Sequence, residues 1–103
     1  MIARTWRGTA GSGEHGVAYE RHFTRNVVPQ LEALPGHRGA YLLRREHDGK
    51  VEFLAMTLWD SIDSIRAFAG ASPNVAMVDP EARAVLTEFD EFVAHYDIAH
   101  SPR

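Results

Sequence analysis

The feature that most constrains how this chain can fold is a pair of apolar segments, residues 39–46 and 51–59. Between them lies His47-Asp48-Gly49-Lys50, and an Asp-Gly dipeptide between two β-forming runs is a strong signal for a tight hairpin. Side chains alternate between the two faces of a strand. In the second segment both sets are largely apolar: Val51, Phe53, Ala55, Thr57 and Trp59 on one face, and Leu54, Met56 and Leu58 on the other. A sheet built on this hairpin therefore needs a cover on both sides.

The rest of the chain predicts helices and two more strands. Apolar residues at helical spacing from Tyr19 to Leu34 indicate a helix over 17–34, with a bend near Val28 because Pro29 lacks an N–H group. Pro35-Gly36 ends this helix. The other expected elements are, in chain order, a strand over 2–7, a loop over 8–16, a helix over 62–69, a short helix over 81–86, a strand over 89–98 and a loose tail over 99–103.

This element order is β-α-β-β-α-β, which predicts a ferredoxin-like α+β fold with an antiparallel four-stranded sheet. The 103 residues suffice for a single domain spanning 1–103. Two helices cover only one face of such a sheet, and monomers rarely leave the other face apolar. We therefore expect a homodimer that packs through the uncovered sheet faces.

Charge and composition exclude several classes of partner and site. The net charge of −3 predicts no nucleic-acid partner and no anionic membrane surface. The absence of cysteine excludes disulfides, thiolate catalysis and cysteine-ligated metals. The six histidines form no metal motif, so we expect neither a metal nor another cofactor. No signal peptide and no membrane span is expected, which favours the cytoplasm.

Three stretches, residues 19–31, 34–45 and 58–68, resemble the antibiotic-biosynthesis monooxygenase family of the dimeric α+β barrel superfamily. The resemblance implies that fold as a dimer. Characterised members include quinone-forming monooxygenases that use neither metal nor flavin, and others degrade haem. The haem-degrading pattern requires Asn, Trp and His at positions that here read as Trp6, Phe68 and Val78, so the resemblance argues against haem degradation.

The candidate catalytic residues are His22 and Asn26, which share a helix face at the edge of the apolar stripe. His22 could accept a proton near neutral pH, and the alternative is a purely structural hydrogen bond. Trp6 and Phe68 match pocket positions of the family. The remaining candidates for binding a small aromatic ligand, each of which has an ordinary structural role as its alternative, are Tyr41, Trp59 and Arg38.

The resemblance implies a cofactor-independent monooxygenase that oxidises a small aromatic or polyketide-like compound with O₂. A deprotonated, electron-rich phenol or anthrone can itself reduce O₂, so the protein needs a base, an anion-stabilising donor and a dry aromatic slot. Two alternatives stay open: a non-catalytic small-molecule-binding domain of the same fold, and another reaction such as cyclisation or isomerisation. His95 and Tyr96 must lie on opposite faces of the last strand, in either phase.

Overall fold

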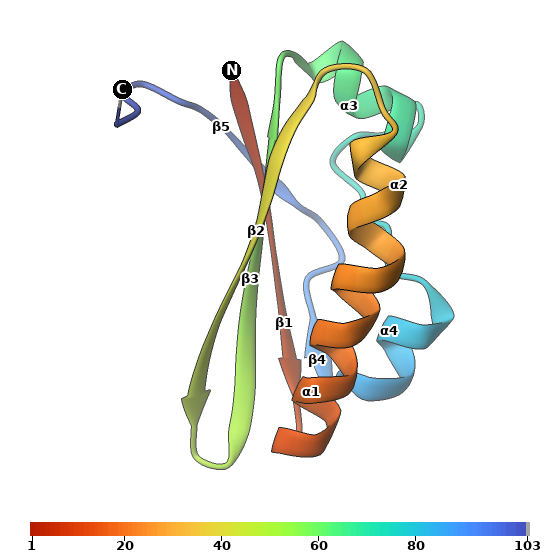
Figure 1. Ribbon diagram of the computed structural model, residues 1–103, viewed down its shortest axis with the longest axis vertical. Helices are drawn as coiled ribbons and strands as arrows, with labels where there is room; N and C mark the ends of the chain where they lie inside the picture. Colours follow the sequence, from red (N-terminus) through yellow and green to blue (C-terminus); the bar gives the residue numbers. More distant parts are fainter. Residues whose placement is uncertain (103) are drawn as a thin grey trace.

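The computed structural model describes residues 1–102 and contains one antiparallel sheet (Figure 1). Its strands are β1 (Ile2–Ala10), β2 (His37–His47), β3 (Lys50–Trp59), β4 (Glu88–Phe89) and β5 (Ala94–Asp97). They are ordered β2-β3-β1, and both β4 and β5 pair with the free side of β1. This arrangement, with helices after β1 and after β3, confirms the predicted ferredoxin-like α+β fold.

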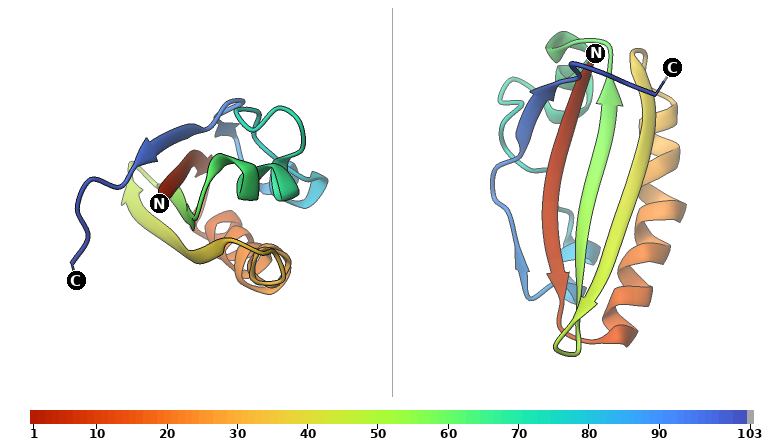
Figure 2. Two further views of the ribbon diagram at one scale, coloured as in Figure 1. Left: turned by 90° about the horizontal axis from the view of Figure 1, so that it is seen from above. Right: turned by 90° about the vertical axis from the view of Figure 1, so that its left-hand side faces the viewer.

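The helices all lie on one side of the sheet, and the opposite side is bare (Figure 1; Figure 2, right). They are α1 (Gly13–His22), the π-helical turn η1 (Phe23–Val27), α2 (Val28–Glu32), α3 (Ile62–Ala69) and α4 (Pro80–Val85). Ser12, Ser61 and Asp79 cap α1, α3 and α4 by accepting a hydrogen bond from a backbone N–H in the first turn. Within residues 1–102, no helix is long and apolar enough to cross a membrane.

The hairpin and the first helix follow the sequence pattern, but the helix begins at Gly13 rather than Val17 and its bend has another form. Asp48 (φ 51°) and Gly49 (φ 76°) adopt the left-handed conformation that a tight two-residue hairpin turn requires. The bend expected near Val28 is instead the π-helical turn η1, in which the Val28 N–H donates to the Phe23 carbonyl. This widened turn places Pro29 in the first turn of α2, where its missing N–H leaves no bond unmade.

The predicted continuous strand over 89–98 is wrong, because the chain leaves β1 midway. Gly8 pairs with Phe89, and Thr5 pairs with Ala94. Between these two pairs, β1 has two residues and the returning strand has four. The intervening residues pair instead with the loop before α4: the Ala76 N–H donates to the Glu91 carbonyl, and the Val93 N–H donates to the Asn74 carbonyl. The predicted four-stranded sheet therefore has its last strand divided into β4 and β5.

The first strand is longer than expected, and its inward face carries the site described below. β1 runs to Ala10 rather than Arg7, since Thr9 and Ala10 continue the ladder opposite Glu52 and Val51. Its inward residues pack beneath the helices with the odd-numbered residues of β3. Two apolar clusters fill this layer, one around Tyr19, Phe23 and Phe53 and one around Leu31, Trp59 and Ile65.

The second cluster should limit the stability of the fold. Ile65 is the fully buried residue through which α3 packs on β3. We expect Ile65→Ala to lower the free energy of unfolding by about 2–5 kcal/mol, because the change leaves a cavity that its neighbours fill only in part. Urea unfolding monitored by circular dichroism measures this loss. The control is Val17→Ala on the exposed side of α1, which should change stability by less than about 0.5 kcal/mol; equal effects would contradict the packing role.

Candidate functional site

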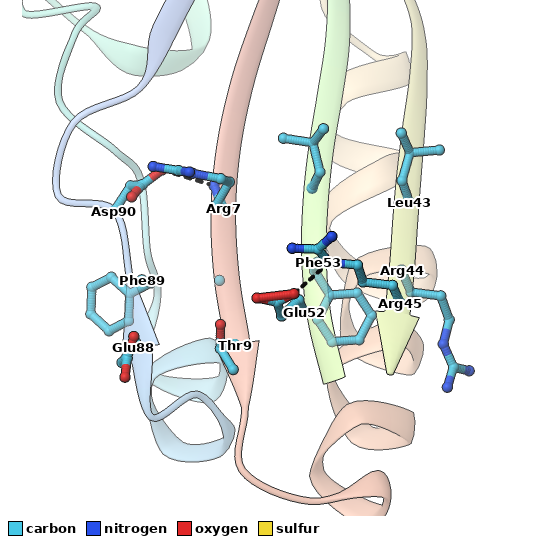
Figure 3. Close-up of a pocket in the computed structure, with 12 residues that line it drawn as sticks. Arg7, Thr9, Leu43, Arg44, Arg45, Glu52, Phe53, Glu88, Phe89 and Asp90 are labelled. Carbon is cyan, nitrogen blue, oxygen red and sulfur yellow. Dashed lines mark hydrogen bonds and ion pairs between the residues drawn. The ribbon is translucent and has the colours of Figure 1, made fainter. Parts of the chain in front are cut away.

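Two hollows could serve as a binding site. The larger, about 570 Å³, is an open groove on the bare face of the sheet (Figure 3). Most of its charged side chains already form pairs, among them Arg7 with Asp90 and Arg45 with Glu52. A shallow groove of paired charges offers little that could hold a reacting molecule away from water. The smaller hollow, about 70 Å³, lies between the sheet and the helices and is the better candidate.

This smaller hollow, called the inner cavity below, combines an aromatic wall with a few polar groups. The aromatic side chains come from β1, α1, η1 and α3: Trp6, Tyr19, Phe23 and Phe68. The polar side chains are Arg4, His22, Thr57 and Asp79. The segment 77–79, just before α4, closes one edge. Such a lining fits a flat apolar ligand with one or two polar substituents.

Trp6 is fixed in place by the chain segment that interrupts the last strand. Its indole Nε1–H donates to the Asp90 carbonyl at 2.8 Å. Its ring lies between those of Tyr19 and Phe89, with centroid distances of 6.1 and 6.3 Å. No side chain at Gly8 could coexist with this ring, because a Cβ there would lie 2.8 Å from a Trp6 ring atom. The cavity wall on β1 is therefore held by a hydrogen bond and by close packing.

His22 is buried at 8% exposure and joins α1 to α4. Its Nε2 lies 2.9 Å from Asp79 Oδ2, and its Nδ1 lies 3.1 Å from Glu81 Oε2. The Asn26 amide nitrogen is 2.9 Å from His22 Nδ1 and donates to Glu81 at 3.3 Å. Asp79 also caps α4 by accepting a hydrogen bond from the Ala82 N–H at 3.0 Å. These four polar side chains form one connected network.

The network accommodates the histidine in both protonation states. A neutral imidazole donates from Nε2–H to Asp79 and accepts at Nδ1 from Asn26, whose second N–H donates to Glu81. An imidazolium donates to both carboxylates, and the Asn26 amide must then turn away, because its nitrogen, 2.9 Å from Nδ1, is itself a donor. His22 can therefore take up a proton without leaving its place, and Glu81, whose side chain is 72% exposed, connects it to solvent.

Burial perturbs the two other titratable side chains of the inner cavity. It raises the pKa of the Tyr19 phenol, and the negative charge of Asp79 raises it further, so this group stays protonated across the physiological range. Burial lowers the pKa of the Arg4 guanidinium to about 10, which still leaves it charged at neutral pH. The cavity thus offers one fixed cation, one fixed phenol and one histidine network.

The structure brings some of the predicted site residues together and separates others. Trp6, His22 and Phe68 line the inner cavity, and Asn26 contacts it through His22. Val78, at the position that the haem-degrading pattern gives to histidine, lines it with Trp6 and Phe68.

The other three predicted ligand-binding residues lie away from the inner cavity. Tyr41 is exposed on the bare sheet face, because it alternates with the inward-facing residues of β2. Arg38 pairs at the surface with Asp60. Trp59 is completely buried in the core, where its Nε1–H donates to Thr57 Oγ1 at 2.8 Å. Core packing accounts for Trp59 and a surface ion pair for Arg38.

Sequence reasoning did not identify Tyr19, Thr57 or Asp79 as candidate site residues. The signal for Asp79 was present, since an Asp before a first-turn proline is typical of a helix N-cap, but its contact with His22 depends on how α4 packs. The phase of the last strand is also resolved: His95 lies opposite Arg4 on the inward side, and Tyr96 is exposed on the bare face. Within residues 1–102, no group of three or more His, Asp or Glu side chains is arranged to hold a metal ion.

The chain resembles known proteins in its fold. No family model and no curated protein matches the sequence. A proposed antibiotic biosynthesis monooxygenase from Bacillus cereus matches with a TM-score of 0.67 at 18% identity, covering 100% of this chain and 95% of that one. The cofactor-independent oxygenase SnoaB from Streptomyces nogalater matches with a TM-score of 0.62 at 18% identity, covering 98% and 95%.

A third solved structure is the heme-degrader MhuD from Mycobacterium tuberculosis with two hemes bound in its active site. It matches with a TM-score of 0.63 at 19% identity, covering 96% of this chain and 97% of that one. The chain has the fold of these proteins. At these identities the likeness establishes the fold alone. Two of the matched structures are described as antibiotic biosynthesis monooxygenases, the family that residues 19–31, 34–45 and 58–68 resemble.

The burial of His22 changes what its removal should do. At the edge of a helix stripe it would carry little packing, whereas in the structure it holds two carboxylates in place. We expect His22→Ala to destabilise the fold by about 1–3 kcal/mol, because Asp79 and Asn26 lose their partner. Chemical denaturation measures this cost. His15→Ala on the exposed side of α1 is the matched control, and an equally small effect of both changes would show that the network carries no stability.

Proposed function

We propose that the protein is a cofactor-independent oxygenase that oxidises a small aromatic compound with O₂ in the inner cavity. The observation that carries the proposal is His22, which lines an aromatic cavity and can exchange a proton with a network that reaches solvent. The resemblance of three sequence stretches to the antibiotic-biosynthesis monooxygenases supports it. So does the fold that the chain shares with SnoaB.

Such a reaction balances without an external reductant if the substrate has an anthrone-like methylene between aromatic rings. Conversion of that CH₂ group to C=O is a four-electron oxidation. One oxygen atom of O₂ enters the new carbonyl, and the other leaves as water with the two methylene hydrogens. The protein then needs only to remove the first proton, hold the resulting anion and exclude water.

The network around His22 suits the proton-transfer step. A proton released in the cavity passes to Asp79. When the neutral imidazole carries its proton on Nδ1, its Nε2 accepts this proton from Asp79 while Nδ1–H releases its own to Glu81 at the surface. Asn26 acts as a positioning residue, since it holds Nδ1 when the neutral imidazole carries its proton on Nε2 instead. These roles assign a base and a proton exit to side chains from two different helices.

The size of the inner cavity limits how a substrate enters. A cavity of ~150 Å³ binds a benzene ring in a well-studied protein, whereas this one measures about 70 Å³. An aromatic substrate therefore requires the edge formed by Met77 and Val78 to move outward while Asp79 keeps its contact with His22. Met77 is suited to this movement, because it is 56% exposed and has a flexible unbranched side chain.

An activity assay tests the proposal directly. With an anthrone-type substrate, we expect O₂ consumption without added metal or flavin. His22→Gln keeps a polar side chain of similar reach but cannot carry a proton, so turnover should fall about a hundredfold, the usual scale for losing a general base. An oxygen electrode measures the rate, and His15→Gln is the control. Tight binding of aromatic compounds with no O₂ uptake would instead identify a ligand-binding domain.

We also propose that two copies of the chain pack through their bare sheet faces. Exposed or half-buried apolar side chains from β2, β3 and β5 gather there: Tyr41, Leu43, Leu54, Met56, Leu58 and Tyr96. An apolar area of this kind is unusual on a monomer. The sheet-to-sheet packing that results is the one that the family resemblance implies.

The oligomeric state is measurable by sedimentation velocity at micromolar concentration. We expect a dimer for the unchanged protein. Met56 lies at the centre of the bare face, between Thr5 and Tyr41, so Met56→Glu should shift the protein to a monomer by burying a charge in the interface. Val17→Glu, an exposed change on α1, should leave the dimer intact. A monomeric unchanged protein would refute this interface.

A further inference from the structure

Arg4 is a buried cation that no carboxylate among residues 1–102 neutralises. It lies on the inward face of β1 at 7% exposure and lines the inner cavity. Its Nη2 donates to the carbonyl oxygens of Val75 and Pro73 at 3.1 and 3.4 Å. Its Nε–H is buried and has no hydrogen-bond partner in the part of the chain that the structure describes. This donor is unpaired, and a ligand reaches it only when the cavity around Arg4 opens.

The groups that face Arg4 are neutral. Its guanidinium carbon lies 5.5 Å from the centre of the Phe68 ring, and Thr57 stands opposite it on β3. His95 is its neighbour on β5, and burial together with the charge of Arg4 lowers the pKa of that imidazole. At neutral pH, therefore, Arg4 carries a charge and His95 does not.

A cation in such surroundings is costly to bury, because two carbonyl groups and an aromatic face replace its hydration only in part. Three other arginines of the sheet show the usual pattern: Arg7, Arg38 and Arg45 are largely exposed, and each pairs with a carboxylate. Asp79, the carboxylate that also lines the inner cavity, is already bound by His22 and by the first turn of α4. Arg4 thus lacks a negatively charged partner among the described residues.

We propose that Arg4 is the anion-recognition residue of the inner cavity and that the ligand is a small aromatic compound bearing a negatively charged oxygen, either a carboxylate or a phenolate. The inference rests on the proposed function for the place of the site and adds the charge of the substrate. The ring of the ligand packs against Trp6 and Phe68. The charged oxygen receives the free Nε–H of Arg4, which a guanidinium holds in a fixed plane.

Isothermal titration calorimetry with benzoate and benzamide tests this charge preference, because the two molecules match in size and differ in charge. The unchanged protein should bind benzoate roughly tenfold to a hundredfold more tightly, the range for a hydrogen bond to a charged group. Arg4→Gln should abolish the preference, and Arg4→Lys should retain part of it. Arg7→Gln, on the same strand but on the bare face, should retain all of it.

Three results would overturn the inference: equal affinity for the two ligands, a preference that survives in Arg4→Gln, or no binding of either ligand. If Arg4→Gln does not fold by circular dichroism, the comparison in the unchanged protein and in Arg4→Lys decides. Binding is measured without turnover, so the two claims fail separately. Benzoate preference without O₂ uptake refutes the oxygenase alone, and O₂ uptake without benzoate preference refutes the role of Arg4 alone.

Discussion

The β2–β3 hairpin carries apolar side chains on both faces, and the rest of the molecule depends on how those faces are covered. The helices bury one set, from Val51 to Trp59, at near-zero exposure for the larger side chains. The other set remains half-buried on the bare face. Because strand alternation is strict, a shift of one residue would exchange the two sets and place Glu52 under the helices. The register with β1 and β2 is thus fixed by hydrophobic burial.

The covered face is not filled uniformly, and its polar groups lie where the elements meet. His22 links α1 to the first turn of α4 through Asp79 and Glu81. Arg4 holds the loop before α4 through two carbonyl groups. The same loop draws the returning strand away from β1 at Val75 and Phe92. The inner cavity therefore arises where a divided strand, a short helix and an irregular loop replace continuous sheet and helix packing.

The inner cavity contains two groups, Arg4 and His22, whose electrostatic surroundings differ. A cation on β1 is buried without a counter-charge among residues 1–102, whereas a histidine on α1 contacts two carboxylates. The first can hold a negative oxygen, and the second can accept a proton and pass it to solvent. Each depends on burial for its effect, since charge interactions weaken strongly in water. The stability lost in keeping such groups inside is offset by the apolar clusters on either side.

The sequence by itself determined the hairpin, the long first helix, the helix Ile62–Ala69 and the presence of a bare apolar face, because these follow from periodicity, turn chemistry and capping. It also placed His22 beside Asn26, since residues four apart share a helix face. Only the tertiary structure decided that the last strand divides, that Asp79 and Glu81 reach His22, that Tyr41 and Arg38 lie outside the cavity, and that Arg4 has no carboxylate partner within the described residues. The contacts of His22 and Arg4 join segments more than fifty residues apart. They and the division of the last strand depend on how α4 and its loop pack, which no local pattern specifies.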